Sequence, residues 1–224
     1  LVCGGDVTVA VLRIVEGTES AKCINDTILV LIPMVKNPTL LSQFRPIGLC
    51  NILYKIASKV ISNRLKQVLP DIVSEEQSAF VPGRLITDNI ITAYECLHFM
   101  KHNKAKKNQS CALKLDMMKA YDRVEWHYLE AIMLRLGFSS RFVRLIMKCV
   151  TSVRFTIRVN GGLLPHFTPS RGFRQGDPVS PYLFLLCADT SLLEFYGGVN
   201  IDRGIRVSYQ SPWINHLLFA DDSL

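Results

Sequence analysis

Three aspartates carry the clearest chemistry in this sequence. Asp221 and Asp222 stand side by side after the apolar run Leu217–Ala220, and Asp116 stands far upstream after a short alternating segment. Adjacent carboxylates at the end of a buried strand repel each other unless a cation lies between them. Carboxylate oxygens suit Mg²⁺ or Mn²⁺, and a pair of such ions can hold both oxygens of an in-line phosphoryl displacement. The three aspartates therefore predict the two-metal site of a nucleic-acid polymerase.

The segment around Asp116 offers further groups. In a strand, Lys114 and Asp116 share one face, and the carbonyl of Met117 directly after the strand is a further ligand for a cation. Tyr121 follows, and an aromatic ring there can lie under a nucleotide's sugar and clash with a 2′-hydroxyl. Taken alone, Asp116 is better explained as a helix N-cap, so its weight comes from the paired aspartates.

A glycine-rich loop at 170–181 precedes a helix and contains Arg171, Arg174 and Gln175. Glycine lets the backbone approach a base pair or sugar closely, and the arginines together with the helix N-terminus can hold phosphate. The alternative is a purely structural loop with an ordinary cap, which Asp177 before Pro178 fits well.

The elements that must position these residues alternate between short strands and longer helices. Periodicity and turn signals predict helices at 5–18, 48–69, 85–102, 122–136, 139–151 and 180–196, and strands at 27–33, 110–116, 153–160 and 213–219. Residues 77–84 are expected to form a loop, and Asn160-Gly161-Gly162 predicts a hairpin turn. The pattern predicts an α+β fold, a sheet with helices on one face.

Composition limits the possible functions. The chain has 224 residues and a formal net charge of +7, which favours an anionic partner such as nucleic acid, although a basic soluble domain fits equally well. Its seven cysteines contain no Cys-x-x-Cys spacing, which argues against a zinc cluster and a disulfide framework. We find no secretory signal or membrane span, so we expect an intracellular protein without a membrane partner. Nothing decides between nucleus and cytoplasm or indicates the oligomeric state.

The sequence resembles the reverse transcriptases of non-LTR (LINE-type) retrotransposons, of the kind abundant in plant genomes. The blocks that carry the resemblance are Phe44–Leu49, Tyr54–Lys59, Asn63–Leu65, Gln77–Arg84, Leu115–Asp122, Arg174–Pro181 and Phe219–Asp222. They follow one another in the order of that family, from about Thr27 to the last residue.

The resemblance implies the fingers and palm of a right-hand polymerase, with a small antiparallel palm sheet and no thumb. It divides the chain into an N-terminal extension at 1–26, a fingers-like part at 27–108 and a palm at 109–224, with the reverse transcriptase domain at about 27–224. The implied activity is RNA-directed addition of a dNTP to a primer 3′-hydroxyl. The implied partners are an RNA template, a DNA primer and dNTP.

The resemblance also implies roles for single residues. Asp116, Asp221 and Asp222, with the Met117 carbonyl, would hold two Mg²⁺ ions, for which Mn²⁺ can substitute. Tyr121 would discriminate the sugar, and Gln175 and Gly176 would contact the nascent base pair and template. The remaining predicted contacts to the triphosphate, template or nucleic-acid backbone come from basic residues, namely Arg84, Arg45, Lys55, Lys59, Arg64, Lys66 and Arg174.

Two alternatives stay open at this point. One is a non-catalytic RNA-binding remnant that uses its basic residues, and the other is a reverse transcriptase like the group II intron maturases. An RNA-dependent RNA polymerase fits less well, because Ala220 and Tyr121 point to DNA synthesis. Since the remainder of the palm and the thumb would lie beyond Leu224, we expect a truncated copy with little or no activity by itself.

Overall fold

Two groups of segments, each drawn from distant parts of the sequence, make up the fold. The computed structural model describes residues 3–102, 111–198, 204–220 and 222–223. The first unit comprises residues 1–65 and 121–184, and the second unit comprises residues 66–120 and 185–224.

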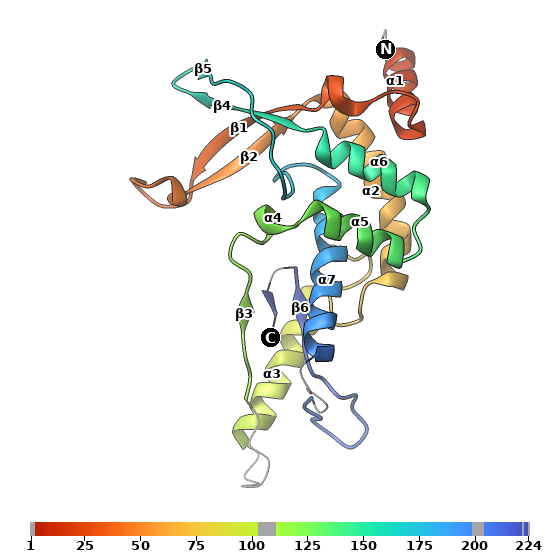
Figure 1. The fold of residues 1–224 in the computed structure, drawn as a ribbon. Coiled ribbons are helices and arrows are strands. Elements are labelled where there is room, and N and C mark those ends of the chain that lie inside the picture. The colour runs from red at the N-terminus through yellow and green to blue at the C-terminus, as the bar shows by residue number, and fades with distance from the viewer. Residues whose placement is uncertain (1–2, 103–110, 199–203, 221, 224) are drawn as a thin grey trace. The chain divides into compact units, whose positions relative to one another are not determined.

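The first unit is built on a four-stranded sheet of order β2-β1-β4-β5 (Figure 1). Its strands are β1 (Asp26–Pro33), β2 (Phe44–Cys50), β4 (Arg154–Val159) and β5 (Gly162–Leu163). β1 pairs antiparallel with β2 and parallel with β4, and β4 turns back into β5. Asn160 and Gly161 in that turn both have positive φ, as a two-residue hairpin turn requires. The predicted strands at 27–33 and 153–160 and the predicted turn are confirmed.

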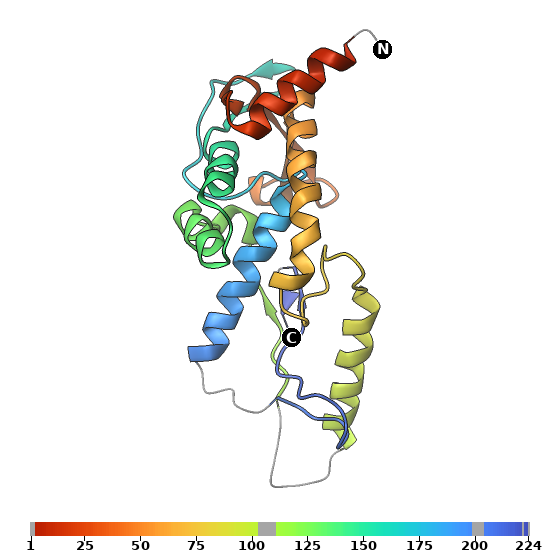
Figure 2. The same cartoon turned by 90° about the vertical axis from the view of Figure 1, so that its right-hand side faces the viewer.

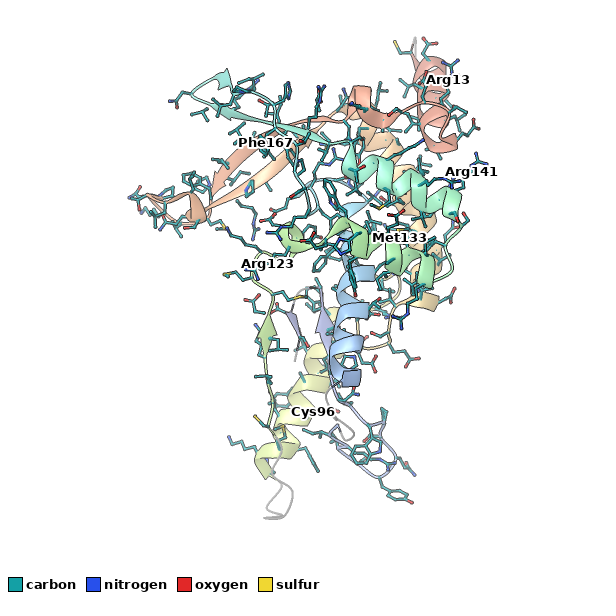
Figure 3. The ribbon with its side chains drawn as sticks, in the orientation of Figure 1. Arg13, Cys96, Arg123, Met133, Arg141 and Phe167 are labelled. Atoms are coloured by element: carbon teal, nitrogen blue, oxygen red, sulfur yellow. The ribbon has the colours of Figure 1, made fainter. Side chains whose placement is uncertain are left out.

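Helices provide most of the core of the first unit. They are α1 (Gly4–Glu16), α4 (Ala120–Arg123), α5 (Trp126–Arg135), α6 (Ser140–Thr151) and the first parts of α2 (Ile52–Ile72) and α7 (Ser180–Gly198), with 3-10 turns at Ala21–Ile24 and Leu41–Gln43. α6 begins where the Ser139 side chain accepts a hydrogen bond from the Phe142 N–H. Met133 on α5 (labelled in Figure 3) and Ile146 on α6 are fully buried, as expected for helices with one apolar face.

The second unit contains a smaller sheet, which is antiparallel and has the order β3-β7-β6. Its elements are α3 (Ile86–His102), β3 (Leu115–Asp116), β6 (Leu218–Phe219), β7 (Asp222–Ser223) and the remaining parts of α2 and α7. Leu69 on α2, Leu185 on α7 and Leu218 on β6 are fully buried. The predicted α+β class with a small antiparallel sheet is confirmed.

Four predicted elements differ from the structure. The helix predicted at 48–69 starts only at Ile52, because residues 44–50 form β2 and pair with β1, a long-range contact that periodicity does not report. The strands predicted at 110–116 and 213–219 shrink to β3 and β6, two residues each, and residue 110 lies outside the described residues.

The helix predicted at 122–136 is divided into α4 and α5. The N–H of Gly172 donates to the Val124 carbonyl, and the N–H of Phe173 donates to the Tyr121 carbonyl. These two carbonyls therefore find partners in the glycine-rich loop rather than in a continuous helix, and Glu125 adopts an extended backbone before α5. In the described part of the chain, no helix is long and apolar enough to cross a membrane.

Candidate active site

Two of the three predicted catalytic aspartates face each other in the second unit. Asp116 on β3 and Asp222 on β7 are direct partners in the antiparallel register. Residues directly opposite in such a pair project from the same face, with Cβ atoms about 5 Å apart. Asp116 is exposed and Asp222 is half-buried. Asp221 lies outside the described residues.

The backbone of the second unit explains how Asp222 reaches this position. β6 and β7 form a hairpin in which Phe219 pairs with Asp222. Ala220 enters the turn with a φ of 54°, a left-handed conformation that is uncommon for a residue with a side chain. The turn is supported by Gln77, whose buried side-chain Oε1 accepts hydrogen bonds from the N–H groups of Ala220 and Ala79, each at 3.0 Å.

Gln77 and Asn89 support the backbone next to the aspartate pair, a role that the sequence did not predict. The amide of Asn89 donates to the carbonyls of Glu76 and Leu218, each at 2.9 Å, so it ties the 74–81 loop to β6. Gln77 was visible only as the first residue of a block that the resemblance assigned to the fingers. The sequence offered no signal beyond a polar residue at the start of this loop, and that signal does not indicate which backbone groups it binds.

Lys114 adds a positive charge beside the aspartate pair. Its Nζ lies 3.2 Å from Oδ1 of Asp222, and both side chains are about half exposed or more, at 68% and 48%. Lys114 directly precedes β3 and alternates with Asp116 along the chain, and both were predicted to share one face. The Lys114 ammonium therefore neutralises part of the negative charge of Asp222.

The donor set fits a divalent cation. Two carboxylates from neighbouring strands on one face are hard oxygen ligands of the type that Mg²⁺ and Mn²⁺ accept. Across the described positions, no three His, Cys, Asp or Glu side chains gather as a metal site. Asp221, the third predicted ligand, is not among those positions. Met117, the predicted carbonyl ligand, directly follows β3.

In the first unit, the glycine-rich loop approaches β2 through its backbone. The N–H of Gly48 donates to the Gln175 carbonyl at 2.8 Å. Gly176 has a φ of 104°, and a Cβ added there would lie 2.9 Å from the Gly48 carbonyl oxygen. Only glycine satisfies both the conformation and the space, and Gln175 thereby sits half-buried beside β2.

A second glycine contact holds the loop against α4. A Cβ on Gly172 would lie 3.0 Å from the Cα of Asp122, and the indole of Trp126 donates to the Gly172 carbonyl at 2.9 Å. Tyr121 on α4 stacks on Phe184, with ring centroids 4.8 Å apart and planes at 18°, and meets Phe173 edge to face. The ring predicted to discriminate the sugar is thus fixed by aromatic packing and stays half-buried.

A cavity of about 170 Å³ opens beside this loop in the first unit. Its lining includes Asp122, Arg171 and Gln175 as well as the apolar Pro46, Phe155 and Phe167. A cavity with an apolar body and a few polar groups at its edge is typical of a ligand site. Gln175, which lines this cavity, is one of the residues that the resemblance predicts to contact the nascent base pair.

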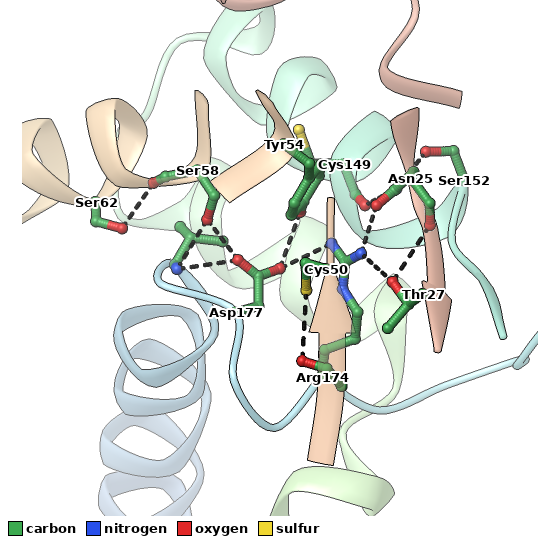
Figure 4. Close-up of polar contacts among 12 residues, drawn as sticks. Asn25, Thr27, Cys50, Tyr54, Ser58, Ser62, Cys149, Ser152, Arg174 and Asp177 are labelled. Atoms are coloured by element: carbon green, nitrogen blue, oxygen red, sulfur yellow. Dashed lines mark hydrogen bonds and ion pairs between the residues drawn. The ribbon is translucent and has the colours of Figure 1, made fainter. Parts of the chain in front are cut away.

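Arg174 and Asp177 form a buried ion pair inside the loop (Figure 4). Arg174 Nη2 lies 2.8 Å from Asp177 Oδ2, and each side chain is 4% exposed. Asp177 also accepts hydrogen bonds from Tyr54, Ser58 and the N–H of Val179. The carboxylate is thereby surrounded by donors, as a buried charge requires.

The other side of the same network reaches β1. Arg174 Nη1 donates to Asn25 and Thr27, and its guanidinium lies 4.1 Å from the centroid of the Tyr54 ring. Burial alone would lower the pKa of Arg174, but the negative charge of Asp177 and its hydrogen bond raise it, so the guanidinium stays charged. Burial and then the charge of Asp177 raise the pKa of Tyr54 well above its usual range, which keeps its hydroxyl protonated as a donor.

Two predicted ligand contacts need correction. Arg174 was expected to bind nucleic acid, but it is 6% exposed and its guanidinium is engaged inside the protein. Arg84 was expected to meet the triphosphate or template. Its guanidinium instead donates to backbone carbonyls at the end of α2 and in the loop that follows, those of Pro70, Val73, Ser74 and Gln77. Both guanidiniums donate to oxygen atoms of the protein itself, a role that sequence spacing does not distinguish from phosphate binding.

The other predicted basic contacts lie on the surface. Lys55, Lys59 and Arg64 on α2 and Arg45 on β2 are exposed, and Lys66 is half-buried. Lys55 and Lys59 are four residues apart and therefore neighbours on one helix face. Their contact with a template stays a prediction.

Comparison with known proteins now identifies the class. Residues 35–224 match the family described as reverse transcriptase (RNA-dependent DNA polymerase), and the chain belongs to that family. Its relatives place it with the non-LTR, LINE-type retrotransposons. It is 35% identical over 166 residues to the Transposon TX1 uncharacterized 149 kDa protein of Xenopus laevis, covering 74% of this chain and 12% of that protein. It is 26% identical over 195 residues to the Pol polyprotein of retrotransposable element R2DM of Drosophila melanogaster, covering 86% and 17%.

Solved structures share the fold. Apo telomerase from Candida tropicalis, truncated from its C-terminal domain, superposes with a TM-score of 0.57 at 13% identity, covering 90% of this chain and 43% of that one. The telomerase of the same organism in complex with the TWJ fragment of telomeric RNA gives a TM-score of 0.58 at 12% identity, covering 89% and 35%. The chain thus spans well under two thirds of these proteins.

Proposed function

We propose that this chain is the part of a LINE-type retrotransposon polymerase that adds a dNTP to a primer 3′-hydroxyl under the direction of an RNA template. The observation that carries the proposal is the direct pairing of Asp116 with Asp222 across β3 and β7. Two carboxylates on one sheet face repel each other, and a divalent cation between them removes that repulsion. The telomerase of similar fold in complex with an RNA fragment supports RNA as a partner.

The metal proposed is Mg²⁺, as two ions held by Asp116, Asp221 and Asp222. Such ions, when bound, would lower the pKa of the primer 3′-hydroxyl and neutralise the charge of the departing pyrophosphate. The chain contributes the geometry: Gln77 holds the turn before β7, and the β3–β7 pairing keeps Asp116 opposite Asp222. Enzymes accelerate phosphoryl transfer mainly by positioning the reactants and by electrostatic stabilisation, so the role of the protein here is to hold these carboxylates in place.

Lys114 would compete with the cation for Asp222. In the absence of metal its ammonium neutralises part of the carboxylate charge, and a bound ion would displace it. Because both side chains are half exposed, the pair contributes less than about 1 kcal/mol. Removing the ammonium should therefore tighten divalent-ion binding by up to about fivefold.

Tyr121, Gln175 and Gly176 are proposed to hold the incoming nucleotide and template. Tyr121 is kept in place by Phe184, and the Gln175 backbone is held by β2. Fixed groups lose little freedom when substrate binds, so they can discriminate between sugars and between base pairs.

The test combines metal binding with primer extension. Mn²⁺ binding to the chain, measured from the electron paramagnetic resonance signal of the free ion, should weaken on the order of tenfold or more in Asp116→Asn and Asp222→Asn. It should tighten in Lys114→Met and stay unchanged in Asp71→Asn, which alters an exposed carboxylate on α2. Equal Mn²⁺ affinity in all variants would refute the metal site.

Primer extension addresses the reaction itself. The chain joined to the thumb of a retrotransposon relative should extend a DNA primer on an RNA template with dNTPs and Mg²⁺. Asp116→Asn should remove the product, and Asp71→Asn should not. RNA binding without extension and without Mn²⁺ binding would instead favour the non-catalytic RNA-binding alternative.

A further inference from the structure

The C-terminal half of α3 carries a row of three aromatic rings that the proposed catalytic site does not use. Tyr94, His98 and His102 are spaced four residues apart and so share one helix face. The ring centroids of Tyr94 and His98 are 6.1 Å apart with planes at 28°, and those of His98 and His102 are 4.1 Å apart with planes at 31°. All three residues are exposed, so core packing does not account for the row.

The ring row forms one wall of an open groove of about 610 Å³. Phe99 and Glu95 of α3 also line it, and Val207, Ser208 and Ser211 line the other side. In Figure 2 the dark blue segment that contains residues 204–217 runs beside the lower end of α3. One wall is therefore aromatic and the other offers hydroxyl groups, which suits a flat ligand with polar edges.

An arginine and two more rings stand next to the groove. The guanidinium of Arg206 lies 5.2 Å from the centroid of the Tyr209 ring and 5.9 Å from that of Trp213. Its Nε donates to the Ser211 carbonyl at 2.9 Å, and Nη2 donates to the Tyr209 carbonyl. Tyr209 is 90% exposed and Trp213 is 58% exposed. The arginine thus shapes the loop while both rings stay open to solvent.

The charges around the groove favour an anionic ligand. Lys101, at the end of α3, is exposed, and Arg206 is half-buried beside the rings. Glu95 is the acidic residue among those that line the groove. The whole chain carries a net charge of +7. Exposed rings interleaved with cations are the composition of sites that bind unpaired nucleic acid.

We propose that this α3 groove, defined by Tyr94, His98, His102, Ser208 and Ser211, binds single-stranded nucleic acid. Bases stack on the ring row and on the Tyr209 and Trp213 rings, and phosphates lie near Lys101 and Arg206. An unpaired strand is required, because a duplex keeps its base faces covered. The site needs neither a metal ion nor the catalytic aspartates; only the identification of the strand with an RNA template rests on the proposed function.

Binding to short oligonucleotides tests the groove directly. A fluorescein-labelled 12-nucleotide RNA, the DNA of the same sequence and an RNA hairpin of equal length are titrated with the whole chain in EDTA, and anisotropy is recorded. Both single strands should bind more tightly than the hairpin. A higher affinity for the RNA than for the DNA would support an RNA template as the bound strand. Equal affinities would support base stacking without a contact to the 2′-hydroxyl.

Variants locate the binding. Tyr94→Ala and Trp213→Ala should each weaken single-strand binding at least about fivefold, because each removes a stacking face. Tyr94→Phe keeps the ring and should bind within twofold of the original chain. Leu97→Ala changes an exposed residue of the same helix that does not line the groove, and should have no effect.

Photocrosslinking separates this site from the catalytic one. RNA containing 5-iodouridine should crosslink to peptides that hold Tyr94, Tyr209 or Trp213, and should do so equally in Asp116→Asn. Unchanged binding in both alanine variants, hairpin binding as tight as single-strand binding, or crosslinks only outside these peptides would overturn the proposal. If these crosslinks form but metal binding or primer extension fails, the proposed polymerase function would be refuted. The proposed binding of single strands in the α3 groove would still hold.

Discussion

Asp177 and Arg174 form a buried pair whose loss should affect the first unit strongly. Replacing Asp177 by Asn keeps the shape of the side chain but removes its charge. The Arg174 guanidinium then lies in the interior without an anion, and arginine does not lose its proton in proteins. Removing one partner of a buried pair costs about 3–5 kcal/mol of unfolding free energy.

The structure allows the two partners to be compared. Arg174→Met leaves Asp177 with three donors, from Tyr54, Ser58 and Val179, and hydrogen bonds to a charged group contribute about 1.5–3 kcal/mol each. We therefore expect Arg174→Met to cost less than Asp177→Asn. The double variant leaves no buried charge at either position, so its loss should be smaller than the sum of the single losses by at least about 2 kcal/mol.

Urea unfolding followed by tryptophan fluorescence measures these losses in the first unit. The chain has two tryptophans, and the Trp213→Phe background leaves Trp126, whose indole donates to Gly172 in the same loop. Glu130→Gln, an exposed carboxylate on α5, serves as the matched control and should change stability by less than about 0.5 kcal/mol. If Asp177→Asn lost no more than this control, or if the double variant lost the full sum, the ion-pair argument would be refuted.

Three further predictions concern single residues. Gly176→Ala should lower the free energy of unfolding by about 1–3 kcal/mol in the same assay, and by more than Gly161→Ala. Both glycines have positive φ, but only at Gly176 would a Cβ lie 2.9 Å from a backbone oxygen. Equal losses of stability in the two variants would contradict this close approach. Arg84→Ala should destabilise the second unit by about 1–2 kcal/mol, measured by Trp213 fluorescence in a Trp126→Phe background, and should leave the KM for dNTP unchanged. A raised KM at unchanged stability would instead support a contact between Arg84 and the triphosphate. Burial raises the pKa of Cys187 to about 12, so roughly one Cys187 thiol in 10⁴ is ionised at pH 8, against about a quarter of ordinary thiols. Mass spectrometry after iodoacetamide treatment should therefore find the exposed Cys111 labelled before Cys187. Early labelling of Cys187 would contradict its burial.

Local patterns in the sequence were sufficient for part of the fold. The helices at 85–102 and 139–151 and the Asn160-Gly161 turn follow from periodicity and turn chemistry, which depend on residues close together in the chain. β2 was not predicted, because Phe44–Cys50 becomes a strand only by pairing with β1. The break between α4 and α5 was not predicted either, because loop residues from a distant segment take the carbonyls that would have continued the helix.

The sequence by itself determined which residues could do chemistry and which family they belong to. The aspartates, Tyr121 and the glycine-rich loop are recognised by type and order, and these are properties of a linear chain. Tertiary structure decided which of them meet and which groups serve the protein instead. Asp116 faces Asp222 because β3 and β7 pair in one register, whereas Arg174 and Arg84 are drawn to a buried carboxylate and to helix-end carbonyls. An arginine presents the same donors to a phosphate as to a protein oxygen, so only its position in the folded chain distinguishes the two roles.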